Sequence, residues 1–339
     1  MAKRARTAGW SRLLHRNLKL LTGPALRAGR AATAKAARSR ADALRPPPGD
    51  GDWLAGVVMG SAGARHYRVY RPPGLLPGER VPLVVMLHGC GQDAKSFATS
   101  TRMNRVAARE RFLVLYPEQS RLANAHGCWN WFETDSGRAY GEAALILKAV
   151  DHTGLLYSVD PARVAVVGLS AGASMAALLA SRHPDRFKAA VMHSGVPPGS
   201  AHSSMTAIGA MQGRRATALP VKPQGAVQAA PARAWPRLLV IHGVADHVVS
   251  VKNGRSAAQA WAAASDALVA KPRSVQRGKR HAMQVTDFVC AGRTVVQLLE
   301  VASLGHAWSG GAASQPYSDS QGPDASRLAW AFITKALQD

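Results

Sequence analysis

The motif Gly168-Leu-Ser-Ala-Gly172 places one serine between small residues. The β-branched run 164–167 precedes the motif and a helical pattern over 173–182 follows it, so the motif is expected at a strand-to-helix turn. Such a turn presents the serine hydroxyl, and the amino end of the next helix favours developing negative charge. The sequence therefore predicts Ser170 as a nucleophile rather than as part of an ordinary helix cap.

A serine hydroxyl is a weak nucleophile and needs a base and an orienting acid. With this kind of turn, the acid follows the serine in the chain and the histidine comes last. Asp246 follows an apolar run at 238–241, and His306 follows another at 295–301. We therefore predict a Ser170–Asp246–His306 triad. His242 is the rival base, but it precedes the acid and is expected to support the acid's loop.

Acyl transfer also needs two backbone donors for the developing oxyanion. The residue after the nucleophile supplies one, which makes the N–H of Ala171 the first candidate. The second should come from a loop after an early strand, and His88-Gly-Cys-Gly-Gln92 follows the apolar run 83–87. Its glycines let the backbone turn closely, so the second donor is assigned to the N–H of Cys90.

Strand-like and helix-like segments alternate through most of the chain, which predicts an α/β protein of the α/β-hydrolase fold. Its mostly parallel sheet should carry helices on both faces. Strands are expected at 67–71, 83–87, 112–116, 164–167, 189–192, 238–241 and 295–301, and helices at about 97–110, 141–153, 171–182, 254–264 and 324–337. We assign 46–54 to a Pro/Gly-rich linker and 55–339 to the catalytic domain. Within that domain, 199–235 has no clear period and is interpreted as a loop or cap.

Positive charge is concentrated at the amino end of the chain. Of a formal net charge of +23, residues 1–45 carry +11, with Asp42 as their only acid. This basic extension could bind an anionic surface such as a membrane or granule, or could be a solvated arm with no partner. Its spacing fits either an amphipathic surface helix or a poorly ordered leader. Basic residues interrupt every apolar stretch, so neither a Sec signal nor a transmembrane helix is expected.

Four motifs taken together resemble the polyhydroxybutyrate depolymerase family of esterases, which includes feruloyl and acetylxylan esterases. They are His88–Gln92, Cys128-Trp-Asn-Trp131, Gly168–Gly172 and Gly305-His-Ala-Trp-Ser-Gly-Gly311, and the resemblance spans about 55–337. The resemblance implies that Cys90 both donates to the oxyanion and forms a disulfide with Cys128. That bond would leave Cys290 free. The resemblance also implies that aromatic residues such as Trp308 and Trp129 line the substrate crevice.

The sequence thus predicts a serine-type carboxylic-ester hydrolase acting on poly- or oligo-3-hydroxybutyrate or related short-chain esters. A feruloyl or acetylxylan esterase, a serine peptidase and a surface-binding protein acting through 1–45 are the alternatives. No cofactor is expected, no Cys/His cluster has zinc-like spacing, and no nucleic-acid-binding motif is present. The resemblance and the disulfide favour an extracellular protein, whereas the missing signal favours a cytoplasmic, granule-associated or membrane-surface one.

Overall fold

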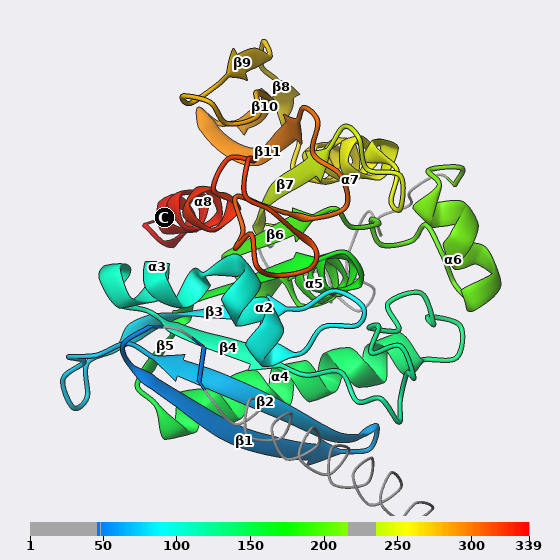
Figure 1. The fold of residues 1–339 in the computed structure, drawn as a ribbon. Coiled ribbons are helices and arrows are strands. Elements are labelled where there is room, and N and C mark those ends of the chain that lie inside the picture. The colour runs from blue at the N-terminus through cyan, green and yellow to red at the C-terminus, as the bar shows by residue number, and fades with distance from the viewer. Residues whose placement is uncertain (1–45, 48, 216–234, 339) are drawn as a thin grey trace, which may run out of the picture. The chain divides into compact units, whose positions relative to one another are not determined.

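The structure, a computed structural model, describes residues 46–47, 49–215 and 235–338 (Figure 1). The basic extension 1–45 and most of the expected cap lie outside these ranges. The described residues from 47 onward belong to one compact unit, which carries every predicted site residue. Within these ranges, no helix combines the length and apolar character needed to cross a bilayer.

A large mixed sheet runs through this unit in the order β1-β2-β4-β3-β5-β6-β7-β11-β10-β8, with β9 also paired to β10. The strands from β4 to β11 in this order are parallel, and antiparallel strands flank them on both sides. The strands are β1 (Asp52–Gly60), β2 (Gly63–Arg71), β3 (Val81–Leu87), β4 (Leu113–Pro117), β5 (Val159–Leu169), β6 (Ala189–His193), β7 (Arg237–Gly243), β8 (Leu268–Val269), β9 (Arg273–Val275), β10 (Met283–Cys290) and β11 (Arg293–Val301). A separate pair, β12 (Trp308–Ser309) and β13 (Ser318–Asp319), lies outside this sheet.

Helices cover both faces of the sheet (Figure 1). On one face lie α4 (Arg138–Leu156), α5 (Ala171–Arg182) and α7 (Val251–Ala264). On the other lie α2 (Ala94–Thr101), α3 (Met103–Glu110) and α8 (Ala325–Leu337). The central strand β3 is fully buried, and its alternate residues enter the two hydrophobic clusters, as expected for a parallel strand covered on both sides.

The predicted fold class is confirmed, and each expected strand and helix has a counterpart, although α2 and α3 form two helices where one was expected. The break falls at Arg102, whose φ of 56° is left-handed and ends α2. The expected linker is partly wrong, because β1 begins at Asp52 and pairs along its length with β2. Helix α6 (Ser204–Met211) forms inside 199–235, the segment expected to be a loop or cap. The remaining part of that segment, 216–234, lies outside the described residues.

Candidate active site

Ser170 occupies the turn between β5 and α5. Its φ of 55° and ψ of −120° form a conformation that non-glycine residues rarely adopt. The turn is tight enough that a Cβ on Gly172 would lie 2.1 Å from the Leu87 carbonyl oxygen. The serine amide donates to the carbonyl of His193 on β6 at 2.9 Å. The local backbone therefore explains why the motif needs small residues around the serine.

The structure brings Ser170, His306 and Asp246 together, although they come from three separate loops. The His306 Nε2 and Ser170 Oγ atoms are 2.9 Å apart. On the other side of the ring, Nδ1 lies 2.8 Å from Asp246 Oδ2. This is the geometry of a nucleophile, a base and an orienting acid, with Nδ1 donating to the carboxylate and Nε2 free to accept the serine proton.

Asp246 is buried, yet its carboxylate has several donors. Oδ1 accepts from the amides of Val248 at 3.0 Å and Val249 at 2.9 Å. Burial alone would raise its pKa, but the hydrogen bond and charge of His306, helped by the Val249 amide, outweigh it and lower the pKa below the ordinary value. The carboxylate is therefore ionised at neutral pH and can stabilise a protonated His306.

His242, the rival base, lies beneath the acid rather than beside the serine. Its Nε2 donates to the Val249 carbonyl at 2.9 Å and is 3.6 Å from Asp246 Oδ2. Its Nδ1 is buried and has no hydrogen-bond partner within the described part of the chain, and burial lowers the pKa of the ring. This placement agrees with a supporting role for His242 under the Asp246 loop.

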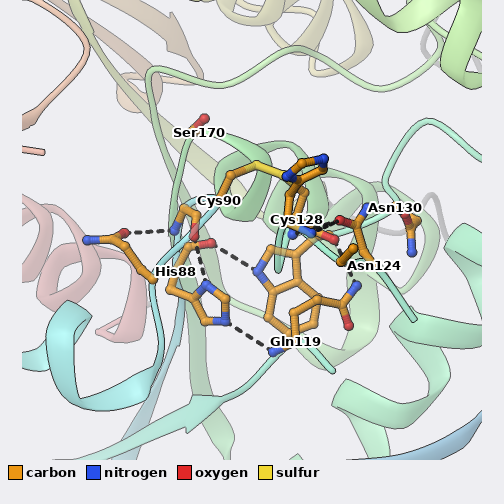
Figure 2. Close-up of a disulfide and its surroundings, with 12 residues drawn as sticks. His88, Cys90, Gln119, Asn124, Cys128, Asn130 and Ser170 are labelled. Atoms are coloured by element: carbon orange, nitrogen blue, oxygen red, sulfur yellow. Dashed lines mark hydrogen bonds between the residues drawn. A yellow bond between two sulfur atoms is a disulfide. The ribbon is translucent and has the colours of Figure 1, made fainter. Parts of the chain in front are cut away.

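Cys90 lies in the loop after β3 and forms a disulfide with Cys128, while Cys290 is free. The Cα atoms of the bonded pair are 4.3 Å apart, so the bond joins two loops closely (Figure 2). Among the described residues, the amides of Cys90 and Ala171 donate to no protein acceptor. Among these residues, neither predicted donor is therefore occupied by a competing protein acceptor.

The expectation that Trp308 and Trp129 line the substrate crevice is wrong, because both side chains are 0% exposed. Trp308 stacks on His193 with ring centroids 5.0 Å apart, and its Nε1 donates to Ser326. Trp129 lies beneath the loop 88–92, where its Nε1 donates to the His88 carbonyl at 3.0 Å. Both indoles pack and position loops, and neither has surface to offer a substrate.

Sequence reasoning missed the role of His193, which lies at the end of β6. Its Nε2 accepts from the Ser309 amide at 3.1 Å, so the imidazole supports the loop that carries His306. Burial, and then the nearby imidazoles of His242 and His306, lower the pKa of His193 to about 3. No sequence motif indicates this role, because the partner of His193, Ser309, is 116 positions away in the chain.

The described ranges contain no cluster of three or more His, Cys, Asp or Glu side chains arranged to hold a metal ion.

Comparison with known proteins places these features in a family. The family described as Esterase PHB depolymerase matches residues 65–270. Poly(3-hydroxyalkanoate) depolymerase C from Paucimonas lemoignei is 41% identical over 131 residues, which cover 38% of this chain and 31% of that protein. Feruloyl esterase B from Neurospora crassa is 29% identical, covering 53% of this chain and 63% of that protein. Acetylxylan esterase A from Talaromyces purpureogenus is 28% identical, covering 66% of this chain and 58% of that protein. The chain thus spans less than two thirds of the length of each of these relatives.

Solved structures share the fold at low sequence identity. An acetyl xylan esterase from Aspergillus awamori superposes with a TM-score of 0.60 at 20% identity, over 76% of this chain and 94% of that one. Dipeptidyl peptidase 4 from Porphyromonas gingivalis superposes with a TM-score of 0.53 at 14% identity, over 89% of this chain and 37% of that one. Because an esterase and a peptidase both share it, the fold leaves the substrate open. The family match covers more than half of the sequence, including the Ser170 turn and the Asp246 loop, and the chain belongs to the PHB depolymerase family of esterases.

Proposed function

We propose that this protein is a serine carboxylic-ester hydrolase in which Ser170, His306 and Asp246 act as nucleophile, base and orienting acid. The observation that supports this most directly is the continuous hydrogen-bonded line from Ser170 Oγ through the imidazole to Asp246, with separations of 2.9 and 2.8 Å. The left-handed backbone at Ser170 adds to it, since such strain persists where the surrounding structure imposes it.

In the first half of the reaction, Ser170 Oγ attacks the ester carbonyl carbon while its proton passes to His306 Nε2. The carbonyl π electrons move to the oxygen, which the amides of Cys90 and Ala171 stabilise. When the tetrahedral intermediate collapses, the carbon–alkoxy bond breaks and the leaving oxygen takes the proton from His306. Water then repeats the sequence on the acyl-enzyme, releasing the acid and restoring Ser170.

For the substrate, we propose a poly- or oligo-3-hydroxybutyrate or a related short-chain ester. Val244 and Val248, which flank Asp246 on its loop, are 52% and 51% exposed, so this loop offers apolar surface. The relatives named feruloyl and acetylxylan esterases favour a second candidate, a feruloyl ester or acetylated xylan. Hydrolysis rates on p-nitrophenyl esters, hydroxybutyrate oligomers, acetylated xylan, feruloyl esters and a peptide substrate distinguish these candidates.

Changing Ser170→Ala tests the mechanism. Loss of the nucleophile is expected to lower turnover on p-nitrophenyl esters by a factor on the order of 10⁶, with little change in melting temperature. Ser181→Ala is a matched control, because Ser181 is buried on α5, the helix that follows Ser170, and its hydroxyl donates to the Leu178 backbone carbonyl at 3.0 Å. Retention of more than a few per cent of activity by Ser170→Ala would refute the assignment.

A further inference from the structure

The oxyanion loop 88–92 has little regular structure and is positioned by the neighbouring segment 124–131 (Figure 2). Besides the Cys90–Cys128 disulfide, the Gly91 amide donates to the His126 carbonyl at 2.9 Å. The Trp129 indole donates to the His88 carbonyl at 3.0 Å. The direction of the Cys90 N–H therefore depends on where that neighbouring segment lies.

The segment is in turn hydrogen-bonded to a buried carboxylate, Glu142 of α4, which is only 3% exposed. Glu142 Oε2 accepts from the Asn130 backbone amide at 2.9 Å. Glu142 Oε1 accepts from Asn130 Nδ2 and from Gln119 Nε2, both at 2.7 Å. Three donors thus converge on one carboxylate, which fixes the main chain and the side chain of Asn130 together.

A buried guanidinium, Arg65 of β2, lies on the other side of Gln119 and is 1% exposed. Its Nη1 donates to Gln119 Oε1 and, at 2.8 Å, to the Glu118 carbonyl. Its Cζ lies 5.0 Å from the centre of the Trp129 ring. The Gln119 amide therefore bridges the two charges, accepting from Arg65 and donating to Glu142 and to the Cys128 carbonyl at 2.9 Å.

We propose that Glu142, paired across Gln119 with Arg65, is a positioning residue for the oxyanion hole. The pair holds residues 128–131, and these hold the Cys90 amide in its direction before negative charge develops on the substrate. Apolar residues of similar size could fill the space but would not direct the Asn130 donors. The inference rests on the proposed esterase function, because it concerns the donor to that reaction's oxyanion.

Glu142→Gln tests this role, since it keeps the volume of the side chain while turning one acceptor atom into a donor that faces Asn130. Misdirecting one oxyanion donor should raise the barrier to the tetrahedral intermediate more than it weakens substrate binding. On p-nitrophenyl esters, kcat is expected to fall about tenfold or more with KM within about twofold. The affinity for a trifluoromethyl ketone, which forms a hemiketal with the serine, should fall by the same factor as kcat/KM.

Thr153→Val is the matched control, because Thr153 is buried near the other end of α4 and donates to the Ala149 carbonyl at 2.7 Å. It should change the melting temperature without changing kcat. In the Cys90→Ser/Cys128→Ser background, Glu142→Gln should lower kcat by a smaller factor than in the intact protein, because both changes act on one loop. If Glu142→Gln does not fold, Asn130→Ser removes one of the same donors and should give a smaller loss of the same kind.

The positioning role would be overturned if folded Glu142→Gln had the wild-type kcat. It would also be overturned if Glu142→Gln lowered kcat by the same factor with and without the disulfide. The esterase proposal would survive those results, since it depends on Ser170→Ala. Activity retained by Ser170→Ala would instead overturn the function itself.

Discussion

Asp246 contacts two imidazoles, and only one of them reaches the serine. His306 bridges Asp246 and Ser170, whereas His242 donates to the Val249 carbonyl beneath the acid's loop. The same carboxylate therefore has two kinds of neighbour, one aligned with the reacting hydroxyl and one structural. Substitution separates their roles.

Asp246→Asn is expected to lower turnover by roughly 10⁴ while leaving the fold intact. The asparagine Oδ1 can still accept from the Val248 and Val249 amides, so its Nδ2 would face His306 Nδ1. That pairing places the ring proton on Nε2. Because Nε2 is then a donor, it cannot accept the proton of Ser170.

His306→Ala should be comparably damaging, and His242→Ala should reduce turnover less while lowering the melting temperature. Steady-state kinetics on a soluble ester, with circular dichroism to verify folding, measure all three variants. If His242→Ala is the more damaging of the two histidine variants, His242 rather than His306 is the base.

Two buried histidines should make the stability of this protein sensitive to acid. Burial lowers the pKa of His88 to about 4, and burial with neighbouring imidazoles lowers that of His193 to about 3. In an unfolded chain, histidine has a pKa near 6.5. Between pH 6.5 and the folded values, the unfolded chain binds more protons, so the free energy of unfolding falls as pH falls. Each histidine should contribute a loss of about 2 kcal/mol between pH 7.5 and pH 5.

Urea unfolding at pH 7.5 and pH 5 measures this effect. His193→Gln and His88→Gln should each be less stable at pH 7.5 but lose less stability on acidification than the parent protein. A free energy of unfolding that is equal at the two pH values would show that the buried imidazoles accept protons in the folded state.

At the scale of elements, the end of β3, the Ser170 turn and the start of α5 pack closely enough to require glycine. In Gly172→Ala, the new Cβ would meet the Leu87 carbonyl oxygen at 2.1 Å and the His88 carbonyl oxygen at 2.5 Å. Both atoms are backbone, so the helix or the oxyanion loop must move. A destabilisation of about 3 kcal/mol and a loss of most turnover are expected.

Gly154→Ala is the contrasting substitution. Gly154 lies in α4, and a Cβ there meets nothing within 4 Å, so alanine should stabilise the helix by about 0.5–1 kcal/mol. Urea midpoints and kcat for the two variants measure the difference. Equal effects of the two substitutions would contradict the close packing at Gly172.

The elements with strong local patterns are the ones that the sequence predicts well. The fully buried runs of β3 and β7 and the helix after Ser170 appear where expected. The edge strand β1 was not predicted, and its residues 52–54 were assigned to the linker, since its burial is partial along its length and it follows a Pro- and Gly-rich stretch. The Arg102 break between α2 and α3 depends on one left-handed residue that no periodicity reveals.

The same contrast applies to the site. The order of serine, acid and histidine could be inferred from motifs, because each follows a recognisable strand. The residues that position the proposed catalytic groups could not be inferred, because they act in pairs far apart in the sequence. Arg65 and Gln119 are separated by 54 positions, and Ser309 and His193 by 116. The burial of Trp308 and Trp129 was missed for the same reason, since an aromatic residue in a motif does not reveal which side of the loop it occupies.

At the scale of the whole molecule, the densest stretch of positive charge and the candidate chemistry occupy separate parts of the chain. The proposed catalytic groups all lie between residues 90 and 306, in the unit that starts at 47. Residues 1–45, which carry +11 of the net +23, lie outside the described residues and outside the family match. We therefore propose that binding of anionic surfaces and ester hydrolysis can be separated by truncation.

Removing residues 1–45 should leave kcat/KM on a soluble p-nitrophenyl ester within about twofold, because no proposed catalytic group is removed. Binding to anionic phosphatidylserine vesicles should fall strongly. For the full chain, binding should also weaken between 0.1 and 1 M salt, as the screening length shortens from about 10 to about 3 Å. A full-length variant with the Lys and Arg of 1–45 changed to Gln is the matched control, since it keeps the length and removes the charge. Vesicle cosedimentation measures the binding, and ester kinetics measure the hydrolysis. If the binding does not depend on salt concentration, or if the charge-free variant binds like the parent protein, the extension does not act through its charge.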